Sequence, residues 1–197
     1  MEAIISTPIS NRKIVSDGAI GMIFLLATEA MFFAGLISAY IVNRAGSMSW
    51  PPSGQPRLPI EVTAVNTLVL MVSAVTIFFF GKKFRKNINS ENISRKILLI
   101  TILLGVVFLV VQGSEWVKLI SYGLTSTSSL YGAFFYLVIG AHAIHVLVGL
   151  IILFYLFFFL KNSFSNESSR NKIMICSMYW YFVVGIWPML YTLVYLM

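Results

Sequence analysis

The side chains of this protein with the clearest chemical potential are a few ionisable groups inside long apolar runs. Glu29 stands in "ATEAMFF" (27–33), with leucines before it and phenylalanines after it. A helix in water would surround such a glutamate with other polar residues, and this segment does not. A carboxyl group in an apolar medium can handle protons, bind a cation or donate hydrogen bonds in its neutral form. Its role therefore depends on the medium around it.

A histidine pair in "GAHAIHVLVGL" (140–150) is the second candidate site. His142 and His145 are three residues apart, so a helix presents both on one face and could offer two ligands to a metal ion or a haem. These are the only two histidines of the chain, and no helix contributes a cluster of carboxylates that would complete a site. Interhelical hydrogen bonding therefore fits the pair better than metal or haem ligation.

The composition indicates that the medium is lipid. Of 197 residues, 58% are hydrophobic and only 11% are charged, whereas about a quarter of the residues of soluble domains are charged. A helix needs about 20 apolar residues to cross a bilayer. Five runs are long enough, and they cover residues 18–42, 60–80, 97–117, 130–160 and 173–197. The predicted fold class is all-α: a polytopic integral membrane protein with a cytoplasmic N-terminal arm (1–17) and a five-helix transmembrane domain (18–197).

Basic residues between the apolar runs predict the direction of the helices. Residues 81–96 hold six of them, residues 161–172 hold three, and the N-terminal arm adds Arg12 and Lys13. The remaining loops and their borders hold only Arg44, Arg57 and Lys118. This bias predicts that the N-terminus is cytoplasmic and that the C-terminus is outside. It also accounts for the formal charge of +7, so we expect contact with anionic lipid headgroups and no nucleic-acid partner.

The predicted direction places the candidate groups at mid-depth. Glu29 lies 11 residues beyond the start of its span at residue 18, about 16 Å along a helix axis. Lipid favours the neutral form of a lone carboxyl group, and no lysine or arginine lies at the same depth. Two roles stay open: a proton-handling or lipid-responsive carboxyl, or a protonated acid that hydrogen-bonds to another helix. His142 is a candidate partner. Glu115 lies near the outer end of its span, where we expect hydration.

Six blocks of the sequence resemble, in the same order, subunit III of the haem–copper cytochrome c oxidases. Glu29 matches the membrane-buried glutamate of that family, His142 and His145 match its helical histidine pair, and Glu115 matches the glutamate of its "SE" block. The blocks touch all five spans, and they read "GMIFLLATEAMFFAGLISAY" (21–40), "WPPSG" (50–54), "EVTAVNTLVL" (61–70), "QGSEW" (112–116), "YGAFFYLVIGAHAIHVLVGL" (131–150) and "YWYFVVGIW" (179–187).

The resemblance implies an accessory, non-catalytic subunit of a respiratory terminal oxidase, whose complex reduces oxygen to water and pumps protons. Such a subunit holds no haem or copper, which belong to the partner subunits I and II. It stabilises the catalytic subunit, binds phospholipid and supports proton uptake at the cytoplasmic surface. We expect lipid headgroups near Lys161, Arg170 and Lys172. The location implied is the cell inner (plasma) membrane, where the complex can join a larger respiratory supercomplex.

Two departures from the family leave alternatives open. Many relatives have seven helices, and this chain begins at the third, so the first helix pair is absent or supplied by another subunit. Relatives often read "WHFVD" where this chain has Tyr181 and Val184, so no role of that histidine or aspartate carries over. Quinol oxidases and nitric oxide reductase systems use similar accessory subunits. A stand-alone proton or cation transporter would predict inverted repeats, and five spans do not divide into equal halves.

Overall fold

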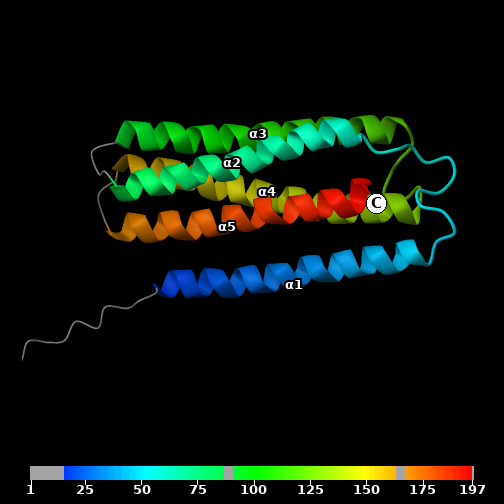
Figure 1. Ribbon diagram of the computed structural model, residues 1–197, viewed down its shortest axis with the longest axis horizontal. Helices are drawn as coiled ribbons and strands as arrows, with labels where there is room; N and C mark the ends of the chain where they lie inside the picture. The colour runs from blue at the N-terminus through cyan, green and yellow to red at the C-terminus, as the bar shows by residue number, and fades with distance from the viewer. Residues whose placement is uncertain (1–15, 87–90, 163–166, 197) are drawn as a thin grey trace, which may run out of the picture.

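The computed structural model describes residues 16–86, 91–162 and 167–196, and these residues form an all-helical bundle (Figure 1). Its elements are α1 (Asp17–Ala45), α2 (Ile60–Lys86), α3 (Glu91–Ser121), α4 (Leu130–Asn162), α5 (Glu167–Tyr191) and a short π-helix (Thr192–Leu196). In this described part, five helices are long and apolar enough to cross a membrane. The predicted all-α class and the five spanning helices are therefore confirmed.

The helices extend beyond the predicted apolar runs. α3 begins at Glu91 and ends at Ser121, whereas the predicted span covered residues 97–117. The difference arises because polar and basic residues at the ends of the runs continue the helical hydrogen bonding after the apolar stretch stops. α1 begins one residue earlier than predicted, at Asp17, because the side chain of Ser16 caps it by accepting a hydrogen bond from the Ala19 backbone N–H at 3.3 Å. Of the predicted N-terminal arm, residues 1–15 lie outside the described residues.

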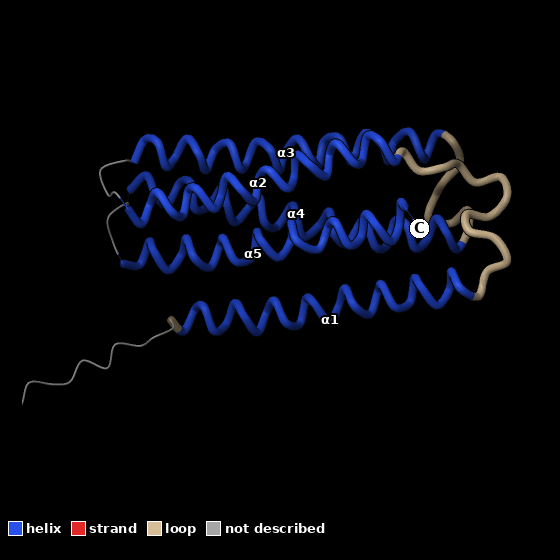
Figure 2. Tube along the Cα trace, in the orientation of Figure 1, coloured by secondary structure: helices blue, strands red, loops and turns tan. Residues whose placement is uncertain are grey.

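Helix α1 is the most peripheral element of the bundle. It lies along one side of the four other helices (Figures 1 and 2) and packs mainly against α5 and α4. In the most apolar 18-residue stretch of α1, only 6% of the residues are buried, whereas 28–44% are buried in the corresponding stretches of the other four helices. Helix α5 is the most buried and contacts α1, α2 and α4. Few contacts therefore hold α1 against the bundle, so each polar contact contributes a larger share of what fixes its position.

Two tryptophans of α5 form the centre of the core. Trp180 and Trp187 are fully buried, and each uses its indole N–H to reach α2. Trp180 donates to Ser73 Oγ at 3.1 Å, and Trp187 donates to Thr67 Oγ1 at 2.8 Å. Tryptophan is buried at low cost when its N–H finds such an acceptor. The polar side chains scattered along α2 therefore serve helix packing.

Candidate functional site

Glu29 and His145 meet between α1 and α4. The distance from Glu29 Oε2 to His145 Nε2 is 2.8 Å, and the two side chains are 29% and 15% exposed. The first and fourth helices therefore touch, but the partner is His145 and not His142, the candidate named from the sequence. The two histidines differ by three residues, which is about 4.5 Å along the helix axis. Only His145 lies at the height of the carboxyl group.

The second ring nitrogen of His145 limits where the proton of this pair can lie. His145 Nδ1 is 2.7 Å from the backbone oxygen of Ala141. A carbonyl oxygen only accepts, so Nδ1 carries a hydrogen and donates it. The bond between Nε2 and Glu29 then contains one proton, held either by a neutral carboxyl group or by an imidazolium facing a carboxylate. Both arrangements have zero net charge, which suits a site inside an apolar bundle.

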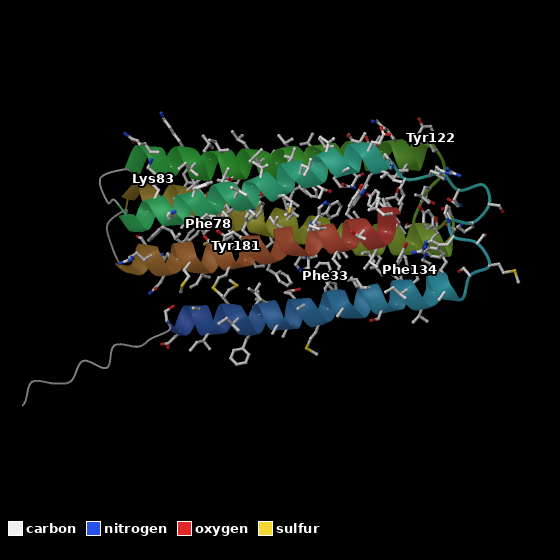
Figure 3. All side chains as sticks on the ribbon, in the orientation of Figure 1. Phe33, Phe78, Lys83, Tyr122, Phe134 and Tyr181 are labelled. Atoms are coloured by element: carbon white, nitrogen blue, oxygen red, sulfur yellow. The ribbon has the colours of Figure 1, made fainter. Side chains whose placement is uncertain are left out.

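Aromatic and aliphatic side chains surround the pair. The ring of His145 lies 4.9 Å from that of Phe33 and 6.0 Å from that of Phe32, centroid to centroid; Phe33 is labelled in Figure 3. Tyr179 of α5 donates a hydrogen bond to the His145 backbone oxygen at 3.4 Å. A cavity of about 270 Å³ borders Glu29, His145 and Tyr179. Its remaining lining is apolar: Met22, Leu25, Ile144, Val148 and Ile152.

His142 occupies a different environment from its neighbour. Its ring is fully buried and stacks on Trp187 at 4.7 Å, with the edges of Phe33 and Phe108 beside it. Neither ring nitrogen has a hydrogen-bond partner among the described residues. The expected interhelical hydrogen bond is therefore made by His145, and His142 packs as an aromatic side chain. Within the described ranges, no group of three or more His, Cys, Asp or Glu side chains could hold a metal ion.

Glu115 is not the hydrated group expected at the outer end of its span. Its side chain is only 7% exposed, and Lys118 Nζ reaches it at 2.8 Å from one turn further along α3. The lysine itself is 61% exposed. The expectation of hydration was wrong for the glutamate because it ignored the direction of the side chain. Glu115 turns inward, and Lys118 connects it to the surface.

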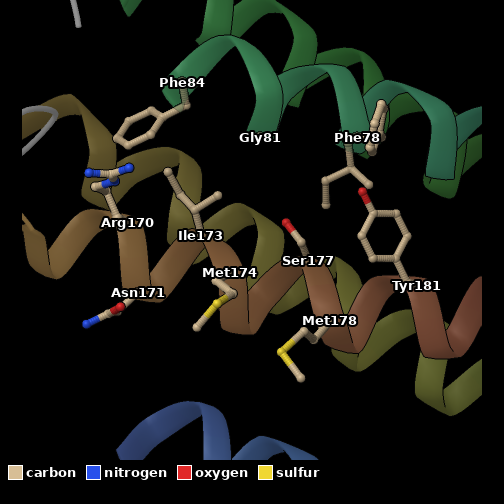
Figure 4. A pocket seen from close by; sticks show the side chains of 11 residues that line it. Phe78, Gly81, Phe84, Arg170, Asn171, Ile173, Met174, Ser177, Met178 and Tyr181 are labelled. Carbon is tan, nitrogen blue, oxygen red and sulfur yellow. The ribbon is translucent and has the colours of Figure 1, made fainter. Parts of the chain in front are cut away.

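Of the three basic residues expected near lipid headgroups, the two whose side chains are described, Arg170 and Lys172, face different sides of α5. Arg170 lines a groove between α2 and α5 (Figure 4). Lys172 lies two residues further and points to α4, where its Nζ is 3.4 Å from the centroid of the Phe159 ring. Positions two apart on a helix do not face the same side. The side chain of Lys161 lies outside the described residues.

The sequence matches known proteins over nearly its whole length. The model of the family described as "Cytochrome c oxidase subunit III" matches residues 7–197. The chain belongs to the cytochrome c oxidase subunit III family. It is 35% identical over 180 residues to the "Cytochrome c oxidase subunit 3" of Corynebacterium diphtheriae, covering 90% of this chain and 86% of that one. The human protein of the same name is 32% identical over 183 residues, covering 89% of this chain and 67% of the human one.

Membership of this family makes the chain an accessory subunit of a terminal oxidase. Respiratory electron transport and a location in a membrane follow from the family and from the five spanning helices. The six sequence blocks that resembled subunit III therefore identified the family correctly. Sequence reasoning missed Tyr179 and Trp187 as neighbours of the two histidines. The block "YWYFVVGIW" (179–187) contains both, and its aromatic content was the available signal.

Proposed function

We propose that this chain is a non-catalytic scaffold subunit of a cytochrome c oxidase in the cell inner membrane. It has a cytoplasmic N-terminus and flanks subunits I and II, which hold the haem and copper. The observation that supports this role is the hydrogen bonding of polar side chains between its helices. Glu29 and His145 bind each other, Trp180 and Trp187 bind α2, and His145 Nδ1 binds its own helix. Apart from His145 Nδ1, each of these groups bonds to a neighbouring helix, as expected of a subunit whose polar side chains hold its own bundle together.

The Glu29–His145 pair attaches α1 to the rest of the bundle. α1 has little buried surface, so one interhelical hydrogen bond is a large part of what specifies its position. We further propose that phospholipid binds among the helices and that the subunit supports proton uptake at the cytoplasmic surface of the catalytic subunit. On this view the pair keeps α1 in place without carrying protons to the oxygen-reducing site.

Affinity purification of the tagged chain in mild detergent tests the proposal. We expect haem-bearing subunits to co-purify, with a haem spectrum, oxygen consumption from reduced cytochrome c and no metal bound to the chain once the partners are removed. A chain that purifies alone from a membrane rich in oxidase would contradict the scaffold role. Turnover with quinol and none with cytochrome c would assign the complex to the quinol oxidase branch.

A further inference from the structure

A groove between α3 and α4 has not been given a role above. Its volume is about 560 Å³, within the range of about 300–1,000 Å³ that is usual for small-molecule sites. Three small residues, Gly113, Gly140 and Ala143, form part of its lining. A Cβ atom added to Gly113 would meet no other atom within 4 Å, so this part of the groove is open. None of the described lining residues is charged, and the groove therefore suits an uncharged, largely apolar ligand.

Two buried polar atoms of the groove's own side chains lack a hydrogen-bond partner. Gln112 and Trp116 both line the groove, and they lie four residues apart on one face of α3. Gln112 is only 2% exposed, and its Nε2 donates to the Tyr195 hydroxyl at 2.9 Å. Gln112 Oε1 and Trp116 Nε1 are both buried without a hydrogen-bond partner among the described residues. A buried donor or acceptor is costly to leave unpaired, so a ligand that bonds to both atoms gains affinity.

One acceptor and one donor on the same face match a hydroxyl group. An O–H group donates one hydrogen bond and accepts another through its oxygen. It can therefore donate to Gln112 Oε1 and accept from the Trp116 indole N–H. A carbonyl oxygen, an ether oxygen or the ionised phosphate of a phospholipid only accepts, and would satisfy the indole alone. Both protein atoms lie just below the surface of the groove, so they bond to a ligand when the amide and the indole turn toward it.

The polar end of the groove lies near the membrane surface. α3 has 31 residues and is about 46 Å long, so about 8 Å extends beyond each side of a centred hydrocarbon core of about 30 Å. Trp116 lies five residues before the end of α3 at Ser121, about 8 Å along its axis. Tyr136 lies at the same end of the bundle on α4, and Leu147 lies 11 residues beyond it, about 16 Å deeper. A ligand therefore places its head beside Trp116 and its apolar tail along α4.

The aromatic side chains at the polar end favour a ring as the head of the ligand. Trp116 and Tyr136 pack edge to face, with their ring centroids 5.8 Å apart, and both line the groove. A third flat ring packs well against such a pair. We propose that the α3–α4 groove binds an uncharged ring that bears a hydroxyl group and an apolar tail, the chemistry of a membrane quinol. The proposal concerns binding alone and depends on the proposed function only in placing the chain in a membrane.

Binding of para-decylphenol to the delipidated oxidase complex tests the proposal, with native mass spectrometry as the readout. The matched ligand is para-decylanisole, the methyl ether of the same molecule, whose oxygen accepts but cannot donate. Gly113→Leu fills the groove, and its control is Gly35→Leu in α1, where a Cβ atom also meets no atom within 4 Å. We expect Gly113→Leu to weaken both ligands about tenfold, because it displaces roughly two methylenes of ligand contact. Gly35→Leu should bind like the wild type.

Three substitutions separate the two hydrogen bonds. The wild type should bind the phenol about threefold more tightly than the anisole, the contribution of one average hydrogen bond in a membrane protein. Gln112→Leu should abolish this preference. Its control, Tyr195→Phe, also removes the bond between Gln112 and Tyr195 but keeps Gln112 Oε1, so the preference should persist. Trp116→Phe keeps an aromatic ring but removes the donor, and should weaken both ligands about threefold.

Several results would overturn the proposal. They are equal binding of phenol and anisole by the wild type, an unchanged preference in Gln112→Leu, and unchanged binding in Trp116→Phe. Displacement of the phenol by equimolar phosphatidylcholine would do the same, because the groove would then hold lipid without selecting a hydroxyl. If Gly113→Leu prevents assembly, the comparison of the two ligands in Gln112→Leu and Tyr195→Phe still decides the proposal.

A competition experiment identifies the natural head group. Decylbenzoquinol, kept reduced under nitrogen, and dioctanoylglycerol are each added to the complex loaded with the phenol. Displacement by the quinol alone would support a ring hydroxyl. Displacement by the diacylglycerol alone, or by neither, would overturn the proposal. These outcomes leave the scaffold role untouched, since that role is tested by whether the haem-bearing subunits co-purify with the wild-type chain.

Discussion

Substitution of Glu29 separates a helix-binding role from a proton-carrying role. In Glu29→Gln an amide N–H can donate to His145 Nε2 in place of the neutral carboxyl, and His145 Nδ1 still donates to Ala141. In Glu29→Ala, His145 Nε2 loses its hydrogen-bond partner, although the His145 side chain is only 15% exposed and has little access to another one. We therefore expect the amide variant to assemble and turn over almost normally, and the alanine variant to loosen α1.

The size of the effect follows from the contact that is lost. Interhelical hydrogen bonds in membrane proteins contribute about 0.6 kcal/mol on average and about 1.7 kcal/mol at most. Glu29→Ala should lower the free energy of unfolding by an amount in this range, and Glu29→Gln should change it by less than about 0.5 kcal/mol. Only 6% of the residues in the apolar stretch of α1 are buried. The alanine variant should therefore show its defect first as loss of α1 packing or of bound lipid.

A double-mutant cycle with His145→Ala measures the pair directly. Thermal stability of the oxidase complex and its unfolding in increasing SDS are measured for wild type, Glu29→Ala, His145→Ala and the double variant. We expect a coupling energy of about 0.6–1.7 kcal/mol, and a coupling of zero would show that the bond contributes nothing. Proton pumping by Glu29→Gln is the decisive second measurement. A complex that assembles normally but loses nearly all pumping would refute the structural role and make the carboxyl part of a proton path.

Three further predictions concern the core. The isolated chain should bind neither haem nor copper, and stoichiometric metal that is lost in His142→Ala would contradict this. His142→Phe should raise stability by about 1 kcal/mol, because it keeps the ring and removes two buried nitrogens that have no hydrogen-bond partner among the described residues; a lower unfolding midpoint would mean that these nitrogens have a partner in the assembled protein. Gly105→Ala should cost about 1–3 kcal/mol, because its Cβ would lie 2.7 Å from Leu150 Cδ2 and 2.8 Å from Trp180 Cη2. At the control position Gly113, an added Cβ atom would meet no atom within 4 Å. Gly113→Ala should therefore raise the free energy of unfolding by about 0.5–1 kcal/mol, which thermal unfolding would measure.

The five helices could be predicted because the signal for each lies within its own segment. An apolar run of about 20 residues is sufficient evidence for a spanning helix, whatever it packs against. The partner of Glu29 could not be predicted, because it depends on the height and rotation of α4 relative to α1. His142 and His145 lie on the same face of their helix, so either could have been the partner of Glu29. A shift of α4 by about one turn along α1 would exchange the two. The sequence showed that the acid needs a partner but not which histidine supplies it.

The same limitation applies to polar side chains near the ends of the helices. The depth expected for Glu115 does not say whether its side chain points to lipid, to water or to a neighbouring helix. Arg170 and Lys172 were both expected near lipid headgroups, which stays a prediction, but the sequence did not show that they face different sides of α5. Interhelical contacts such as that between Trp187 and Thr67 join residues 120 positions apart. No local pattern encodes a contact over that distance.

The attachment of α1 to α4 and α5 has a consequence for biosynthesis. Glu29 and His145 are 116 residues apart in the chain, and ribosomes add about 5–20 residues per second. The carboxyl group is therefore synthesised about 6–23 s before its histidine. During that interval α1 is retained by its own apolar side chains against a cost of about 2.5–3.5 kcal/mol for an acid at mid-depth. Helices α2 and α3 are made in the same interval, but α1 packs mainly against α5 and α4, so it waits for its main packing partners until the last two helices are inserted.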